Sequence, residues 1–230
     1  EELRQLRKNA PVNYIIFLDD TFTLNKDWVR EFCQSYGQEF GMGFSINARA
    51  DTVNPDVISM LAKAGCMHIV YGVESGSKRV REDILNRPGD NRLYIDAVRW
   101  TKEAGMLATT NYMIGMPGET GQDIEETLAL NEEIAPDDFG CFVFYPYPGT
   151  VLFDVCRDHG YLPENYLELP AADGQSILTM PGLTKEEIAR YYQVFCRVRE
   201  NSYLKKYGAA FNEEDQTLAV ERLRGGTDAA

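Results

Sequence analysis

An alternation between short apolar runs and longer helix-like stretches is the feature that most limits the fold of this chain. The first run, at residues 14–18, is almost unbroken by polar side chains, which is typical of a strand buried on both faces. Strands that alternate with helices form parallel sheets through right-handed crossovers. The pattern therefore predicts an α/β fold with a parallel sheet. The expected strands are residues 14–18, 43–47, 67–73, 106–114 and 139–144.

Start and stop signals place helices between these strands. Asn25 and Asn54 can each cap a helix, and Pro55 suits a first helical turn. Thr120 with Asp123 resembles a capping box, in which each side chain bonds the main chain of the other residue. The helices expected from these signals cover residues 25–40, 54–65, 91–104 and 121–134.

Composition narrows the class of protein. The 230 residues, 44% of them apolar, suffice for one sizeable domain with an appendage. The net charge of −13 repels a phosphate backbone, so we expect no nucleic-acid partner. No apolar stretch reaches the roughly 18 residues of a membrane span, and no signal peptide is visible. Five cysteines without a C-x-x-C pair indicate buried thiols in the reducing cytoplasm, not disulfides or a zinc site.

Residues 111–120 join an expected strand to an expected helix through a glycine-containing turn. Gly115 and Gly118 let the main chain approach a ligand closely, and Pro117 stiffens the bend between them. Glu119 places a carboxylate at the lip of this turn. Taken alone, the segment is also compatible with an ordinary connection between a strand and a helix.

Polar residues follow the expected strands directly, and these residues form the candidate site. The carboxyl ends of parallel strands meet at one edge, where ligands bind. Carboxylates suit an ammonium group and vicinal hydroxyls, a guanidinium suits a carboxylate, and bare main chain suits a flat base. The edge therefore suits a zwitterion that carries ribose hydroxyls. The candidate residues are Asp19, Asp20, Asn47, Arg49, Glu74, Ser75, Ile114, Gly115, Glu119 and Tyr145.

Each candidate also has a structural alternative when it is taken alone. Asp19 and Asp20 can simply end a strand. Arg49 can form a surface ion pair with Asp51, which contributes little to stability. The polar segment that begins at Glu74 can cap the following helix. Their joint position after apolar strands favours a site.

A metal-dependent hydrolase of the barrel class is a second possibility. It would use the carboxylates of Asp19, Asp20, Glu74 and Glu119. It lacks the histidines that such sites usually contain, because neither of the two histidines follows a strand. His68, inside an expected strand, is expected to be a packed core residue.

Five sequence segments identify a protein family more specifically as a set than any one of them does alone. They are Phe17-Leu18-Asp19-Asp20-Thr21-Phe22, Ala48-Arg49-Ala50-Asp51, Gly72-Val73-Glu74-Ser75-Gly76-Ser77, Met113-Ile114-Gly115-Met116-Pro117-Gly118-Glu119-Thr120 and Pro146-Tyr147-Pro148-Gly149-Thr150. As a set they resemble the core of radical S-adenosylmethionine (SAM) enzymes. More narrowly, they resemble the branch that is often preceded by a cobalamin-binding domain. The resemblance covers residues 1–158.

The resemblance implies a partial (β/α)6 TIM-like barrel that binds a [4Fe-4S] cluster and SAM. In such enzymes the cluster donates an electron that cleaves SAM, and the resulting 5′-deoxyadenosyl radical abstracts a substrate hydrogen. The expected reaction is methyl transfer or oxidative cyclisation on a small or lipid-like molecule. The expected partners are an electron donor such as flavodoxin or ferredoxin and, through a further domain, cobalamin. A methylthiotransferase acting on transfer RNA is less favoured, because the chain is strongly acidic.

The resemblance also assigns roles to the candidate residues. Asp19 and Asp20 would lie near the SAM amino group, and Arg49 would face its carboxylate. Glu74 would contact the ribose or the methionine part of SAM. The candidate set on these strand ends is completed by Asn47 and Ser75.

At the other end of the ligand, Ile114, Gly115 and the main chain near Tyr145 would flank the adenine. Glu119 would hold the turn or bind a ribose hydroxyl.

The sequence departs from the family at the cluster. The family holds its cluster through a C-x-x-x-C-x-x-C loop after the first barrel strand, and this sequence contains no such loop. We therefore expect the chain to begin inside the first barrel helix, without the first strand, and to be inactive alone. The alternative is a barrel without a cluster that serves as a binding or scaffolding module.

The expected domain boundaries follow from these assignments. The partial barrel covers residues 1–158, a loop and helical extension covers residues 159–224, and a disordered tail covers residues 225–230. Within the extension, Thr184 and Glu187 resemble a second capping box that opens a helix. A weaker helix is expected at residues 213–224.

Overall fold

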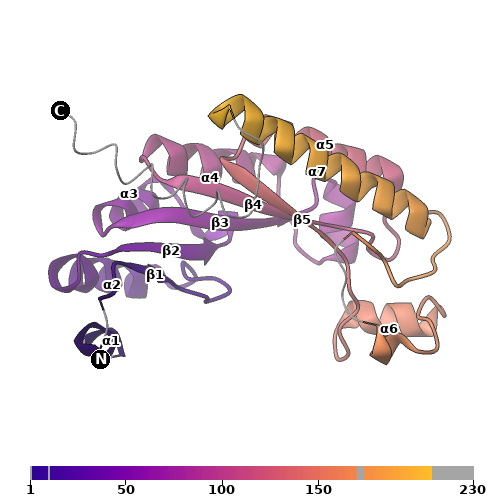
Figure 1. The fold of residues 1–230 in the computed structure, drawn as a ribbon, viewed down its shortest axis with the longest axis horizontal. Helices are drawn as coiled ribbons and strands as arrows, with labels where there is room; N and C mark the ends of the chain where they lie inside the picture. The colour runs from indigo at the N-terminus through magenta and orange to yellow at the C-terminus, as the bar shows by residue number, and fades with distance from the viewer. Residues whose placement is uncertain (1, 10, 170–173, 209–230) are drawn as a thin grey trace.

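A single parallel sheet organises the protein. The structure is a computed structural model that describes residues 2–9, 11–169 and 174–208. Within these residues, the strands are hydrogen-bonded in the order β1-β2-β3-β4-β5 (Figure 1). The expected helix at 213–224 and the expected tail at 225–230 lie outside the described residues. The strands are β1 (Tyr14–Ile16), β2 (Gly43–Ala48), β3 (Cys66–Glu74), β4 (Leu107–Ile114) and β5 (Asp138–Val143).

Helices follow the strands along the chain, as the alternating pattern predicts. A π-helix (Val80–Ile84) follows β3, and short 3-10 turns lie at Ala50–Thr52 and Tyr166–Glu168. None of the described helices is long and apolar enough to cross a lipid bilayer. The α-helices are α1 (Glu2–Asn9), α2 (Lys26–Glu39), α3 (Pro55–Lys63), α4 (Asn91–Glu103), α5 (Gly121–Ile134), α6 (Val151–Asp158) and α7 (Lys185–Tyr207).

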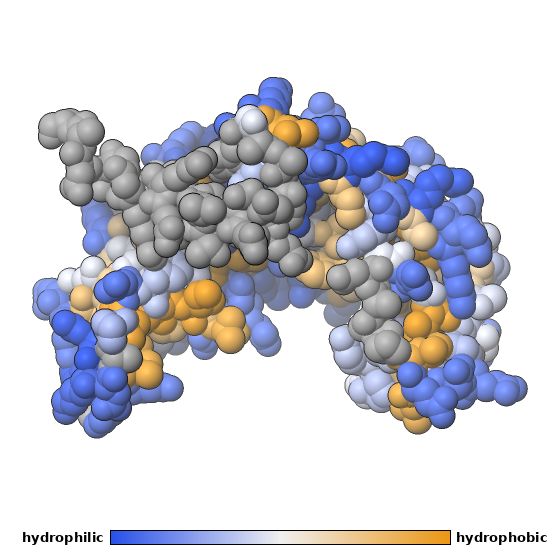
Figure 2. Space-filling model, viewed as in Figure 1, coloured by the Kyte–Doolittle hydropathy of each residue, from blue (hydrophilic) through white to orange (hydrophobic). Residues whose placement is uncertain are grey.

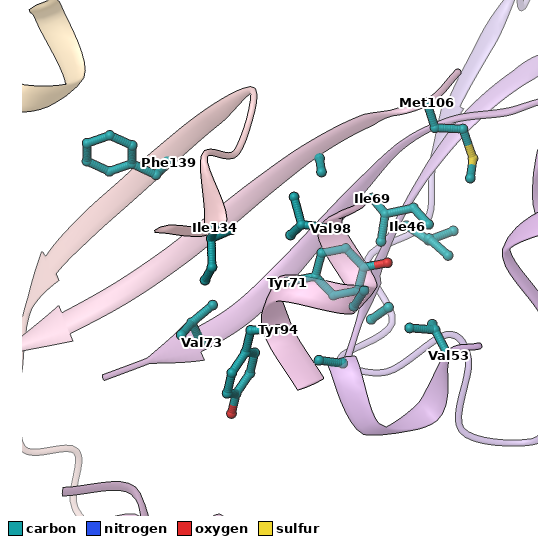
Figure 3. Close-up of a cluster of buried hydrophobic side chains, with 14 of the residues drawn as sticks. Ile46, Val53, Ile69, Tyr71, Val73, Tyr94, Val98, Met106, Ile134 and Phe139 are labelled. Atoms are coloured by element: carbon teal, nitrogen blue, oxygen red, sulfur yellow. The ribbon is translucent and has the colours of Figure 1, made fainter. Parts of the chain in front are cut away.

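One face of the sheet packs against the helices and forms the core. Side chains alternate between the two faces along a strand. On the covered face, Ile46, Ile69 and Tyr71 lie in one buried cluster with Val98 of α4 (Figure 3). The Tyr71 hydroxyl also shares a 2.8 Å hydrogen bond with Thr101 of α4. This packing fixes the strands, and with them the loops at their carboxyl ends.

The opposite face of the sheet is concave and open. Ile16 of β1 is 64% exposed there and Phe142 of β5 is 55% exposed. Figure 2 shows a hollow beneath the sheet, between the N-terminal part of the molecule and the lobe that carries α6. A curled parallel sheet with helices on its outer face is a partial barrel, so the predicted fold class is confirmed.

Local sequence signals predicted the starts of the helices correctly. The Asn25 side chain accepts the main-chain N–H groups of Asp27 and Trp28, and the Asn54 side chain accepts that of Val57. Complete capping boxes open α5 at Thr120 and α7 at Thr184. These caps are encoded within four residues of sequence, which is why they could be predicted.

Four features differ from the expectations. Helix α6 was not predicted, although Thr150 caps it by accepting the N–H of Phe153. Strand β1 is shorter than the apolar run that predicted it. His68 lies on the open face instead of in the core, and its ring shares a 2.8 Å hydrogen bond with Thr109. Cys196 is exposed, whereas Cys66 is buried as expected.

Candidate functional site at the carboxyl ends of the strands

The loop after β1 carries Asp19 and Asp20, and both are exposed. The Asn47 side chain at the end of β2 donates a 3.3 Å hydrogen bond to the main-chain carbonyl of Asp19. The Asn47 carbonyl in turn accepts the N–H of Phe22 at 3.0 Å. These bonds tie the first two strand ends together and leave both aspartate carboxylates facing solvent.

Arg49 follows β2 and forms a two-pronged ion pair with Asp51. Its Nε and Nη2 donate to the two carboxylate oxygens at 3.0 and 2.7 Å. Both side chains are nearly half exposed. This is the surface pair that the sequence left open as an alternative, and a role for Arg49 in ligand binding stays a prediction.

The end of β3 places Glu74 in an unusual conformation. Its φ of 66° lies in the left-handed region, which non-glycine residues rarely adopt. The Glu74 carboxylate accepts a 3.1 Å hydrogen bond from Nη1 of Arg87. A Cβ at Gly72 would lie 2.7 Å from this carboxylate, so the glycine makes room for it. Burial raises the pKa of Glu74, and the charge and hydrogen bond of Arg87 oppose that rise.

Arg87 is therefore a site residue that the sequence did not reveal. It lies in the turn after the π-helix, between Asn86 and a glycine-containing bend, and Asn86 also has a positive φ of 49°. The segment Arg87-Pro88-Gly89 is recognisable from sequence only as a turn. Its arginine meets Glu74 through the tertiary fold.

Ser75, by contrast, points into the interior. Its side chain is fully buried, and its hydroxyl lies 3.2 Å from that of Thr127 in α5. The same hydroxyl accepts the N–H of Ser77, and Thr127 also accepts the N–H of Gly76 at 2.8 Å. Ser75 thus anchors the end of β3 to α5, and a direct ligand contact through its side chain stays a prediction.

The turn after β4 is organised by Glu119. One oxygen of this buried carboxylate, Oε2, accepts the N–H groups of Gly115 at 2.6 Å and Met116 at 3.2 Å. The other oxygen, Oε1, is buried without a hydrogen-bond partner. Gly115 has a φ of 81°, which requires glycine in practice. Burial raises the pKa of Glu119 from 4.5 to about 8, although the two main-chain bonds oppose the rise.

Arg79, in the segment after β3, also stabilises the turn after β4. Arg79 donates to the carbonyl of Gly118 at 2.9 Å and to both carboxylate oxygens of Asp123. Asp123 also receives a 2.6 Å hydrogen bond from Ser77. The turn after β4 is thereby linked to the segment after β3. Ile114, just before the turn, is fully buried, and its carbonyl accepts the N–H of Phe144 at 2.8 Å.

Glu119 should make stability depend on pH. Its carboxyl keeps a proton in the folded protein up to a pKa of about 8 but loses it near 4.5 when unfolded. The wild-type free energy of unfolding should therefore fall as pH rises between these values. Glu119→Gln removes this loss, so the variant should gain stability relative to wild type between pH 5 and pH 8. Urea unfolding at both pH values measures this, with exposed Glu133→Gln as the control. Parallel pH dependence of the Glu119→Gln variant and wild type would contradict the assignment.

Tyr145 follows β5 and borders a cavity of about 710 Å³. Its hydroxyl donates to the carbonyl of Leu169 at 2.8 Å, and its ring centre lies 5.0 Å from that of Tyr147. No charged side chain occurs among the described residues that line this cavity. They include Ile84, Leu85, Met113, Phe142, Phe144, Tyr145, Tyr147, Val151 and Leu152.

The described residues do not fit a [4Fe-4S] cluster. Within them, no group of three His, Cys, Asp or Glu side chains could hold a metal ion. The cysteines lie on separate elements, and burial raises the pKa of Cys33 and Cys156 to about 11 and that of Cys66 to about 12. Thiols with raised pKa values are poor sources of the thiolate that binds iron.

The same edge does fit the amino-acid end of SAM. An ammonium and a carboxylate on one ligand match the carboxylate of Glu74 and the guanidinium of Arg87, which lie side by side. Gly72 leaves room beside this pair, because a Cβ there would lie 2.7 Å from Oε1 of Glu74 and 3.7 Å from Nη1 of Arg87. The fit rests on charge complementarity and on space.

Comparison with curated proteins finds relatives that include a methyltransferase and a cyclase. An uncharacterized methyltransferase of Pyrococcus horikoshii is 29% identical over 192 residues, which cover 83% of this chain and 41% of the relative. An anaerobic magnesium-protoporphyrin IX monomethyl ester cyclase of Cereibacter sphaeroides is 27% identical over 163 residues, covering 69% and 26% of the two chains. This chain thus spans less than half the length of either relative.

Solved structures share the fold. The radical S-adenosylmethionine methyltransferase TsrM from Kitasatospora setae, solved with cobalamin and a [4Fe-4S] cluster bound, matches with a TM-score of 0.60. The identity is 15%, and the match covers 83% of this chain and 39% of that one. The pattern of the radical SAM superfamily matches residues 1–130, which include the strand ends that carry Glu74 and Glu119. The chain belongs to the radical SAM superfamily.

Proposed function

We propose that this chain is the SAM-binding core of an enzyme that transfers a methyl group to, or oxidatively cyclises, a small or lipid-like substrate. The superfamily uses SAM and a [4Fe-4S] cluster, and SAM is the source of the radical chemistry or the methyl group. The observation that carries the proposal is the ion pair of Glu74 and Arg87 at the carboxyl edge of the sheet. The similarity to a methyltransferase and to a cyclase supports the two reaction types.

The Glu74–Arg87 pair is suited to receive a zwitterion. Both side chains are partly exposed, at 23% for Glu74 and 40% for Arg87, so a ligand can reach them. A bound ammonium would pair with the carboxylate and a bound carboxylate with the guanidinium, so neither protein charge is left without a partner. In this arrangement Asp19 and Asp20 add negative potential near the ammonium from their exposed loop.

Glu119 has a different role in this proposal. Its Oε2 already holds the N–H groups of Gly115 and Met116, so it shapes the turn against which the adenine would lie. Its Oε1 is enclosed, with almost no exposed surface. The contacts of Glu119 therefore favour support of the turn over binding of a ribose hydroxyl.

The cavity beside Tyr145 is the proposed place for the substrate. Its volume of about 710 Å³ lies in the range of small-molecule sites, and its lining is apolar and aromatic. A neutral, largely apolar substrate group suits such a lining, because a charged group would lose its hydration there without gaining a partner. This supports a lipid-like or flat apolar substrate.

A charge placed at the cavity should prevent apolar occupancy. Val151 lines the cavity, is 78% exposed and opens α6, where an acidic residue is favourable. Val151→Asp should therefore fold normally but reduce Nile red binding several-fold, as measured by fluorescence titration. Leu24→Asp, at a 74% exposed position away from the cavity, is the matched control. Equal dye binding by both variants and wild type would argue against the cavity as an apolar site.

The remaining components belong to the whole protein and are part of the same proposal. They are a [4Fe-4S] cluster held by residues other than those described, cobalamin, and an electron donor such as flavodoxin or ferredoxin. Cobalamin is present in the solved structure of TsrM. We place the protein in the cytoplasm, because all five cysteines are free. We propose no nucleic-acid partner, because the chain is strongly acidic.

The test of the function is a product assay. Full-length protein, purified without oxygen and reduced with dithionite, should convert SAM to 5′-deoxyadenosine with methionine or to S-adenosylhomocysteine. The first product set indicates radical initiation by SAM cleavage, and the second indicates methyl transfer. Formation of neither product by iron-loaded protein would contradict the proposal.

A further inference from the structure

Arg81 is the largest side chain buried almost completely in the described protein, with 1% of its surface exposed. It lies in the π-helix Val80–Ile84, an irregular element that is frequent at functional sites. Burying a guanidinium is costly unless its N–H groups find partners. Its Nη1 donates to the carbonyl of Ser75 at 2.7 Å, and its Nη2 donates to the carbonyl of Gly89 at 3.1 Å. Its partners are thus main-chain carbonyls, and its Nε has none.

Each of these two carbonyl partners lies just after one member of the proposed SAM-binding pair. Ser75 directly follows Glu74, and Gly89 lies two residues after Arg87. The main-chain carbonyl of Arg81 itself accepts the N–H of Arg87 at 2.7 Å. One residue therefore holds the chain beside both members of the pair.

The segments beside these contacts contain strained main chain. Glu74 has a φ of 66° and Asn86 a φ of 49°, and the one other described non-glycine residue with positive φ, Ala135, ends α5. Non-glycine residues with positive φ persist only where the surroundings determine them. The ring of Tyr94 lies 5.4 Å from the guanidinium carbon and completes the enclosure of Arg81.

We propose that Arg81 is a positioning residue for SAM: it fixes the main chain at both Glu74 and Arg87, so that carboxylate and guanidinium face the amino-acid end of the ligand. The proposal rests on the function proposed above, in which this pair receives that end. A planar guanidinium can donate to two carbonyls in different directions, whereas a lysine ammonium is a point charge without this fixed geometry. Arg81 acts through its neighbours and does not touch SAM.

The test is a double-mutant cycle on SAM affinity in the full-length protein, measured by calorimetry. Arg81→Lys keeps the charge but loses the two-directional geometry, and it should weaken SAM binding about 10-fold, the value of one charge-assisted hydrogen bond. Combined with Glu74→Gln, it should weaken binding by clearly less than the product of the two single effects, because both changes disable the same pair. Exposed Arg92→Lys is the matched control and should leave SAM affinity unchanged.

A purely structural role makes a different prediction. Arg81→Lys would then lower the melting temperature without changing SAM affinity, or the two affinity losses would multiply fully, and either result overturns the proposal. If Arg81→Lys does not fold, Tyr94→Leu, which removes the ring beside the guanidinium, carries the same expectation. Failure of the proposed function is distinguishable, because Glu74→Gln alone would then leave SAM affinity at the wild-type value.

Discussion

Replacing Glu74 with glutamine is expected to weaken SAM binding about 10- to 100-fold, which corresponds to the loss of one charged hydrogen bond of about 1.5–3 kcal/mol. Glutamine has nearly the same shape and keeps the space that Gly72 provides. It removes the negative charge that would face the ligand, and it leaves Arg87 without its carboxylate partner. Calorimetric titration of full-length protein with SAM measures the effect.

The control is the same substitution at another glutamate that is paired with an arginine. Glu39 pairs with Arg4 near the N-terminus, and Glu39→Gln should leave SAM affinity unchanged. Iron content should be the same in all samples, so that a lost cluster does not mimic a lost contact. Wild-type affinity in the Glu74→Gln variant would remove Glu74 from the site.

Gly76→Ala is expected to have the largest effect on stability. A Cβ at this position would lie 2.5 Å from the carbonyl oxygen of Glu126 and 2.5 Å from the Cα of Thr127, both main-chain atoms of α5. Helix and strand must therefore separate, at a cost of about 3 kcal/mol. For a chain of this size, the melting temperature should fall by roughly 6–12 °C.

Gly37→Ala provides the matched comparison for Gly76→Ala. Gly37 lies inside α2, and a Cβ there would meet its nearest neighbour at an ordinary 3.6 Å. Alanine should be neutral or stabilising by up to about 1 kcal/mol, because it is the better helix former. The melting temperatures of the two variants and of wild type, measured by thermal unfolding, test both expectations. A Gly76→Ala protein as stable as wild type would show that α5 does not pack this closely on the end of β3.

The fold was largely predictable because its signals are local or periodic. Apolar runs gave the parallel strands, and residue pairs such as Asn54 with Pro55 gave helix starts within one turn. Helix α6 was missed because it is short and follows a proline- and glycine-containing segment that resembles a continuing loop. The exposed apolar side chains of Ile16 and Phe142 show the limit of the pattern, since an apolar run does not say which face of a strand is covered.

The positions of the candidate residues were predictable in outline, but their contacts were not. Strand ends located Glu74 and Glu119 at one edge, because the carboxyl ends of parallel strands meet there. Three arginines donate hydrogen bonds that help to hold this edge, namely Arg79, Arg81 and Arg87, and each meets its partner through the tertiary fold. A helical stretch rich in arginine is usually a solvated surface, so its sequence gave no reason to single these residues out.

The most direct test of the central claim is a crystal structure of the full-length protein with SAM bound. We expect the amino-acid end of SAM to lie within hydrogen-bond distance of Glu74 and Arg87, and the adenine to lie against the turn at Gly115. Bound SAM that contacts neither Glu74 nor Arg87 would rule out this site and would place the ligand elsewhere on the barrel.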